Sequence, residues 1–119
     1  MSNSNLIRHI YIRDTHDRPI GCIAVRVMRS KNRAEYGLAM RHPKDAVDEK
    51  HRMIKLDRQL AQQLAEAELD TDPKRTYISN EADFHEVTAA VLSNVIANAA
   101  APTRAIRFAK RWLNNMQEI

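Results

Sequence analysis

Residues 20–41, IGCIAVRVMRSKNRAEYGLAMR, predict the β-hairpin around which the rest of the chain is organised. Large apolar side chains alternate with small or polar ones on both sides of a polar break at residues 29–33, a pattern typical of two half-buried strands. A two-residue turn centred on Lys31-Asn32, where Asn tolerates a positive φ, sets the register. It pairs Val27 with Tyr36, Val25 with Leu38 and Ile23 with Met40.

The two faces of this hairpin differ in side-chain size. The face just described is wholly apolar, whereas the opposite face is thin and partly positive. It pairs Arg26 with Gly37, Ala24 with Ala39 and Cys22 with Arg41. Because a one-residue slip would exchange the faces, the apolar match supports the hairpin.

Another strand and a long helix flank the hairpin in the sequence. Residues 7–13 predict a strand that completes a three-stranded antiparallel meander over residues 6–41, with a first turn at residues 14–19. Residues 43–69 predict one amphipathic helix, capped by His42 or Asp45 and packed across the apolar face of the sheet. Its apolar stripe is Met53, Leu56, Leu60, Leu64 and Ala67.

The C-terminal part predicts a helical pair over residues 80–117, interrupted at Pro102. The first helix can be capped by Ser79, Asn80 or Asp83, and Phe84, Val87, Val91 and Val95 form its apolar stripe. We therefore expect one α+β domain over residues 1–119: a three-stranded meander, a long helix packed on it, and two C-terminal helices.

Charge is segregated along the chain. Residues 1–58 carry 13 Lys/Arg and 7 Asp/Glu, residues 59–103 carry 2 and 7, and residues 104–119 carry 4 and 1. Positive charge is thus concentrated in the predicted sheet and the start of the long helix, which favours a polyanionic partner.

The tip of the hairpin is the first candidate binding surface. Arg29, Lys31 and Arg33 lie at its turn, and Arg26 and Arg41 extend the positive face. Such a ribbon can contact phosphates or an acidic protein surface. Alternatively, these charges are solvated and keep an exposed edge from associating.

The C-terminal helix offers a second candidate surface, because Arg104, Arg107 and Arg111 recur at steps of three and four residues. One interpretation is a recognition helix that enters a nucleic-acid groove. Another is that this stripe neutralises Glu66, Glu68 and Asp70, whose negative charge at the end of the long helix opposes the helix dipole.

The sequence predicts no catalytic residues, metal ligands or cofactor. Cys22 is the single cysteine, and the five histidines lack ligand spacing. Asp14, His16 and Asp17 are close in sequence but predict a turn held by aspartate hydrogen bonds. Asp48-Glu49-Lys50 has the spacing of some metal-dependent nucleases, yet the expected helix makes an Asp48–Arg52 ion pair the better account.

The sequence contains no apolar run of the roughly 18 residues that a membrane span requires, and the N-terminus has no basic and then apolar signal pattern. We expect a cytoplasmic protein without membrane contact.

The segments Asp17-Arg18-Pro19-Ile20-Gly21-Cys22-Ile23-Ala24 and His42-Pro43-Lys44-Asp45, followed by Lys50 and a basic helix, resemble small uncharacterised proteins of phages and prophages. The resemblance covers about residues 10–64. It implies a mobile-element setting, in which small non-catalytic proteins bind and redirect host nucleic-acid machinery, and it carries over no functional residues.

These observations favour a small, non-enzymatic, phage-type protein that docks on a host protein or nucleoprotein complex and inhibits or redirects it. Complexes that handle nucleic acid, including nuclease or CRISPR-like defence complexes, are the expected targets. The alternatives are a direct DNA- or RNA-binding regulator and, third, a small metal-dependent nuclease. The residues expected at the interface are Arg26, Arg29, Lys31, Arg33, Arg41, Arg104, Arg107 and Arg111. Homo-oligomerisation is also possible.

Overall fold

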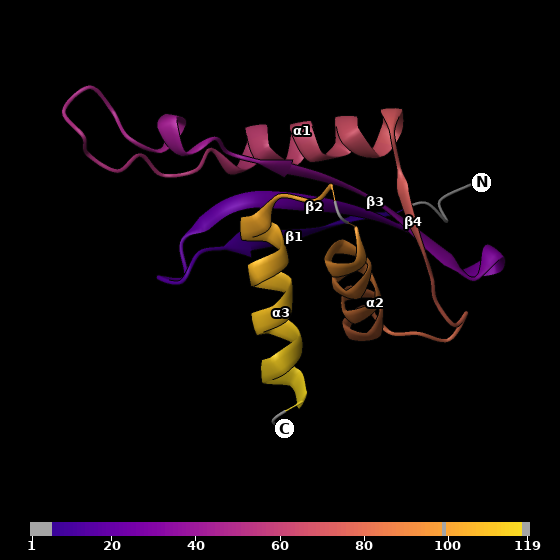
Figure 1. Cartoon of the computed structure of the whole chain (residues 1–119). Helices are drawn as coiled ribbons and strands as arrows, with labels where there is room; N and C mark the ends of the chain where they lie inside the picture. The colour runs from indigo at the N-terminus through magenta and orange to yellow at the C-terminus, as the bar shows by residue number, and fades with distance from the viewer. Residues whose placement is uncertain (1–5, 99, 118–119) are drawn as a thin grey trace.

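The computed structural model, which describes residues 6–98 and 100–117, is an α+β fold with a four-stranded antiparallel sheet (Figure 1). The strands lie in sequence order and are β1 (Ile7–Arg13), β2 (Pro19–Met28), β3 (Arg33–Met40) and β4 (Lys74–Tyr77). Helix α1 (Arg58–Thr71) lies on one face, and α2 (Phe84–Ala97) and α3 (Thr103–Gln117) lie on the other. The sequence predicted three of these strands as a meander, and β4 adds a fourth strand beside β3.

The β2–β3 hairpin has the predicted faces but a different register. Val25 lies opposite Tyr36, and Ile23 lies opposite Leu38, so the predicted pairing is wrong by two residues. The loop is longer than a two-residue turn, because η1 (Arg29–Lys31) forms a 3₁₀ turn and Asn32 follows it with a φ of 53°. A shift of two residues preserves the faces, since side chains alternate with a period of two.

The apolar face of the sheet packs on α2 and α3 and forms the main core. This core includes Ile23, Val25 and Tyr36 from the sheet, Val91 from α2 and Phe108 from α3. The prediction that the helix ending near residue 69 covers this face is therefore wrong. Helix α1 lies on the opposite, thin face of the sheet.

Small side chains on the thin face allow α1 to approach closely. Cys22 and Ala24 are fully buried beneath Ala61, Ala65 and Leu69 of α1. A Cβ added to Gly37 would lie 2.5 Å from the carbonyl oxygen of Ala65 and would also clash with the backbone nitrogen of Leu69. The helix backbone thus rests almost directly on the backbone of β3.

The predicted apolar stripe of this helix is wrong for the same reason. Ala61 and Ala65 face the sheet, whereas Leu60 and Leu64 are 50% and 51% exposed. Where the two backbones come closest, the thin sheet face accepts alanines and leaves no space for larger side chains, and Leu69 is buried at the end of the same contact.

The predicted helix over residues 43–69 is also shorter than expected. Pro43–Ala46 form a 3₁₀ turn (η2), with the His42 ring accepting a hydrogen bond from the Lys44 N–H, and α1 begins at Arg58. The Asp57 side chain caps α1 by accepting the Leu60 N–H at 3.1 Å. Between these helices the chain forms an irregular loop that contains one bridge, Val47 to Met53.

The C-terminal helical pair is present as predicted. Asp83 caps α2 through a reciprocal capping box with Glu86. None of the helices in the described ranges is long and apolar enough to cross a membrane.

We predict that Gly37→Val lowers the free energy of unfolding by about 3 kcal/mol, because the new side chain overlaps backbone atoms of α1 that have no room to move. Urea unfolding followed by circular dichroism measures the change. Ala67→Gln, which enlarges a side chain on the exposed side of the same helix, is the matched control and should change the value by less than about 0.5 kcal/mol. Equal stability of Gly37→Val and the wild type would contradict the packing.

Candidate functional site

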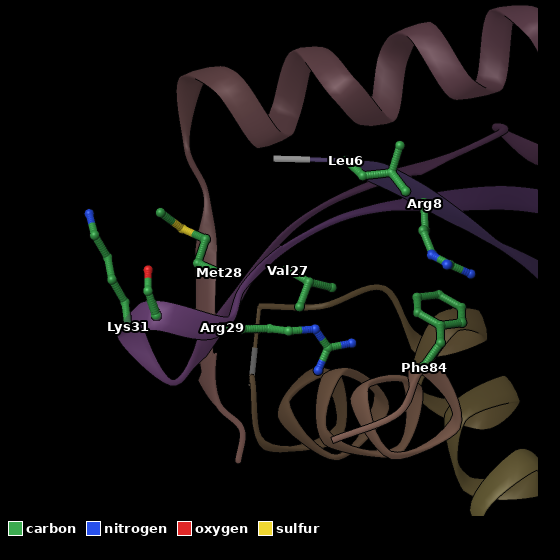
Figure 2. Close-up of a pocket in the computed structure, with 8 residues that line it drawn as sticks. Leu6, Arg8, Val27, Met28, Arg29, Lys31 and Phe84 are labelled. Carbon is green, nitrogen blue, oxygen red and sulfur yellow. The ribbon is translucent and has the colours of Figure 1, made fainter. Parts of the chain in front are cut away.

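Arg29, at the tip of the β2–β3 hairpin, makes hydrogen bonds within the molecule. Its side chain extends from the tip toward α2 (Figure 2). The guanidinium donates to the carbonyl oxygens of Ala82 and, at 3.4 Å, Asn80, just before α2. Arg29 therefore ties the tip to the start of α2. Lys31 projects from the tip and is exposed.

Arg26 and Arg33, also predicted to bind a partner, meet at a buried carboxylate. The Glu35 side chain is 8% exposed and lies 3.5 Å from both guanidiniums and 3.0 Å from that of Arg75. Arg26 also pairs with Asp70 at 3.1 Å. These arginines compensate internal acids, so Lys31 is the predicted tip cation that remains most available to a partner.

The C-terminal stripe divides into anchored and exposed cations. Arg104 donates to the carbonyl oxygen of Arg41 at 2.6 Å, and Arg111 donates to that of Arg13 at 2.7 Å. Arg107 and Lys110 are exposed. The stripe thus fixes α3 against the ends of β1 and β3.

The alternative in which this stripe neutralises the acids of α1 is wrong. Helices α1 and α3 lie on opposite faces of the sheet, and no ion pair in the described part of the chain joins them. Glu66 instead contacts His9 at 2.6 Å, and Asp70 pairs with Arg26. The sheet itself supplies the groups that face the acidic end of α1.

Three segments far apart in the sequence come together at one end of the sheet, which we call the basic end. Residues 13–18 and the loop over residues 41–58 extend from the same end, opposite the β2–β3 tip, and the hydrogen bonds of Arg104 and Arg111 join residues 104–111 to them (Figure 1). These segments hold 12 of the 19 Lys/Arg but six of the 15 Asp/Glu. The rest of the chain holds seven and nine, so the excess positive charge is spatially concentrated.

Two turns with the same hydrogen-bond pattern engage aspartate carboxylates at the basic end. In residues 14–18, Asp14 accepts the backbone N–H groups of His16 and Arg18, both at 2.9 Å, and the Arg18 guanidinium at 3.0 Å. In residues 48–52, Asp48 makes the equivalent bonds to Lys50 and Arg52 at 2.8 to 2.9 Å. The fourth residue of each turn, Asp17 or His51, has a φ of 61°.

These aspartate turns confirm the predicted hydrogen-bonded turn at residues 14–17. The predicted Asp48–Arg52 pair also forms, but in a loop and not on a helix. Burial alone would raise the pKa of Asp14, yet the N–H groups of Arg18 and His16 and the Arg18 guanidinium outweigh it and lower the pKa. The N–H of Arg52, followed by the other bonds of the turn, lowers the pKa of Asp48.

The β2–β3 tip borders a pocket of about 590 Å³ that sequence reasoning missed (Figure 2). Arg8 of β1 and Phe84 of α2 contribute to it, and the Arg8 guanidinium lies 4.8 Å from the centre of the Phe84 ring. Arg29 and Lys31 line the same pocket. Phe84 was predicted as a core residue, and no local pattern links it to Arg8.

Potential metal ligands are dispersed in the part of the chain that the structure describes. Within residues 6–98 and 100–117, no three His, Cys, Asp or Glu side chains are placed to hold one metal ion. Cys22 is buried, and this desolvation, aided by the charge of Glu66, raises its pKa to about 11. The thiol is therefore neutral at physiological pH.

Comparison with protein-family models, curated proteins and solved structures finds no match to this chain.

We predict that the N–H resonances of Arg18 and Arg52 titrate with midpoints below 3.8, the ordinary Asp pKa. A folded-state pKa below the unfolded value means that each ionised Asp stabilises its turn at neutral pH and loses this effect as the pH falls through the folded-state pKa. An NMR titration from about pH 6 to about pH 2 measures both.

Asp48→Asn is the control for this titration. It should abolish the Arg52 transition and leave that of Arg18 unchanged, because each turn is closed by its own carboxylate. Wild-type midpoints at or above 3.8 would contradict the geometry of the turns.

Proposed function

We propose that this protein is a non-enzymatic binding protein that docks through its basic end on an acidic or phosphate-lined surface of a nucleic-acid-handling complex, and so inhibits or redirects that complex. The observation that supports this proposal is the meeting of residues 13–18, 41–58 and 104–111, which carry 12 Lys/Arg and six Asp/Glu. The resemblance to phage and prophage proteins suggests a host complex, such as a nuclease or CRISPR-like defence complex.

The cations at this end are suited to contact a partner. Lys44, Lys50, Lys55, Arg107 and Lys110 are exposed, and within the described ranges their side chains make no hydrogen bond or ion pair. Several of the nearby acids are already engaged, since Asp14 and Asp48 close turns and Asp57 caps α1. The positive field therefore extends into solvent, where it accelerates encounter with an acidic surface and aligns the two partners.

Docking at the basic end would inhibit the complex by blocking a binding surface. A cationic surface that binds acidic groups or phosphates covers the path that a nucleic acid or an acidic protein would otherwise take. No bond needs to be made or broken for such inhibition.

A direct DNA- or RNA-binding role is the second candidate, and the pocket at the β2–β3 tip favours it (Figure 2). Arg8, Arg29 and Lys31 surround the pocket with positive charge, and the stacked Arg8–Phe84 pair resembles the platforms on which proteins hold unpaired bases.

We predict that Arg107→Glu/Lys110→Glu weakens binding to the partner complex by at least about tenfold, because both cations face solvent from the basic end. The partner is first recovered from host lysate with the tagged protein, and its affinity is then measured by interferometry at two salt concentrations. The matched control is Lys31→Glu/Lys74→Glu, which carries the same net charge and alters two lysines outside the basic end.

Equal losses in the two double variants would mean that net charge alone governs binding, and would contradict docking at the basic end. The same proteins titrated with single-stranded and duplex nucleic acid at low salt test the second candidate. A steep loss of affinity with salt, reduced by Lys31→Glu/Lys74→Glu and retained in Arg107→Glu/Lys110→Glu, would favour the nucleic-acid-binding role.

A further inference from the structure

Large apolar side chains are exposed mainly in one place. Six of them are exposed in the described part of the chain, and four of these lie on α1 or the loop before it: Met53, Ile54, Leu60 and Leu64, with exposed fractions of 54%, 43%, 50% and 51%. The other two, Leu6 and Tyr77, lie elsewhere. An apolar group of this kind is typical of an interaction site.

The four residues border two adjoining hollows, which together we call the apolar groove. One hollow, of about 440 Å³, lies between α1 and the loop and is lined by Met40, Leu56, Leu60 and Leu64 among others. The other, of about 370 Å³, is lined by Pro19 and Met53. Both hollows share Arg41, Ile54, Lys55 and Leu56, so they are continuous along the loop.

Internal packing does not account for Leu60 and Leu64. Helix α1 contacts the sheet through Ala61, Ala65 and Leu69, and the close approach at Gly37 fixes the rotation of the helix. The two leucines are consequently held at the side of the helix, exposed to solvent. In a protein without a partner at this position, a polar side chain would be exposed to water at a lower free-energy cost than leucine.

The rim of the groove is positively charged. Arg18, Arg41, Lys55 and Arg58 line the smaller hollow, and no acidic residue of the described ranges lines it. Arg18 is paired with Asp14, but Arg41 donates to the carbonyl oxygen of Ile54 at 2.6 Å, and the Arg58 guanidinium lies 5.2 Å from the centre of the Tyr11 ring. Within the part of the chain that the structure describes, the cations of Arg41 and Arg58 are therefore fixed beside apolar surface without a carboxylate partner.

The larger hollow has a mixed rim. Asp45 and Asp57 line it together with Arg41, His42 and Lys55. The Asp57 carboxylate is occupied as the cap of α1. Positive charge therefore dominates where the two hollows meet.

We propose that the apolar groove binds an acidic amphipathic segment of a partner protein, with apolar side chains along one face of a helix and carboxylates beside them. The apolar face would cover Ile54, Leu60 and Leu64, and the carboxylates would meet Lys55 and Arg41. A second copy of this chain is the poorer occupant, because a symmetric pairing through the groove would bring the two positive rims together. The inference rests on the proposed function, since it names the chemistry of the protein partner.

The test uses a displayed library of random peptides of roughly 16 residues, about four helical turns, selected against the full chain. We expect enrichment of peptides with apolar residues at helical spacing and several Asp or Glu. Leu60→Gln/Leu64→Gln leaves every charge in place and should lower the affinity for the selected peptides by more than about tenfold. Ile54→Gln tests the opposite wall of the groove, and Tyr77→Gln is the matched control for loss of an exposed apolar side chain.

Binders without acidic enrichment would overturn the proposal. So would no enrichment at all, or binders that Leu60→Gln/Leu64→Gln and Ile54→Gln both hold with wild-type affinity. Sedimentation of the protein alone provides a further outcome: self-association that Leu60→Gln/Leu64→Gln abolishes would assign the groove to a second copy. The leucine variants keep the cations, and Arg107→Glu/Lys110→Glu keeps the groove. Suppose that Leu60→Gln/Leu64→Gln loses peptide binding while Arg107→Glu/Lys110→Glu binds the partner complex as the wild type does. This result would support the groove and would reject docking through the exposed cations of α3.

Discussion

The close contact between α1 and the thin face of the sheet is the constraint on which the rest of the structure depends. Gly37 leaves room for the helix backbone, and the small side chains of Ala24 and Cys22 allow α1 to pack closely on the neighbouring strand. A helix that rests on such a surface presents small side chains at the closest approach, so Ala61 and Ala65 form the contact there and Leu69 completes it. The larger side chains of the sheet are then left for α2 and α3, which build the main core on the other face.

This constraint also determines what the molecule exposes. With its rotation fixed by the alanines, α1 holds Leu60 and Leu64 at the edge of the groove, beside a loop whose turn is closed by Asp48 and Arg52. The sheet ends bind α3 through Arg104 and Arg111, which brings further cations to the same end. One end of the molecule thereby combines excess positive charge with exposed apolar surface, the two properties that the proposed docking role requires.

Local patterns in the sequence predicted the parts of the fold that depend on local physics. The alternation in residues 20–41 gave the correct faces, and the aspartate-rich segment at residues 14–17 gave the correct turn. The helix was wrong in length and in its packing face, because leucine spacing at residues 60 and 64 indicates burial only if a partner within the fold is large enough to receive it. Gly37 was the signal for the opposite choice, since a glycine within a strand marks close approach of another backbone.

The candidate site was harder to predict from the sequence than the fold. Net charge along the chain indicated a cationic surface, but the pairing of Arg26 with Glu35 depends on a cross-strand neighbour that the shifted register decides. Arg33 reaches the same carboxylate from two residues away on β3. The basic end and the Arg8–Phe84 pair arise from long-range contacts, for which sequence spacing carries no signal.

The most direct test of this account is the rate at which single cysteines on α1 react with a thiol reagent. The variants are Leu60→Cys, Leu64→Cys, Ala61→Cys and Ala65→Cys, with the wild type as background, because Cys22 is buried and its pKa is raised to about 11. We expect reaction at positions 60 and 64 at least about a hundredfold faster than at 61 and 65, whose modification requires the helix to leave the sheet. Faster reaction at 61 and 65 than at 60 and 64 would contradict this packing of α1.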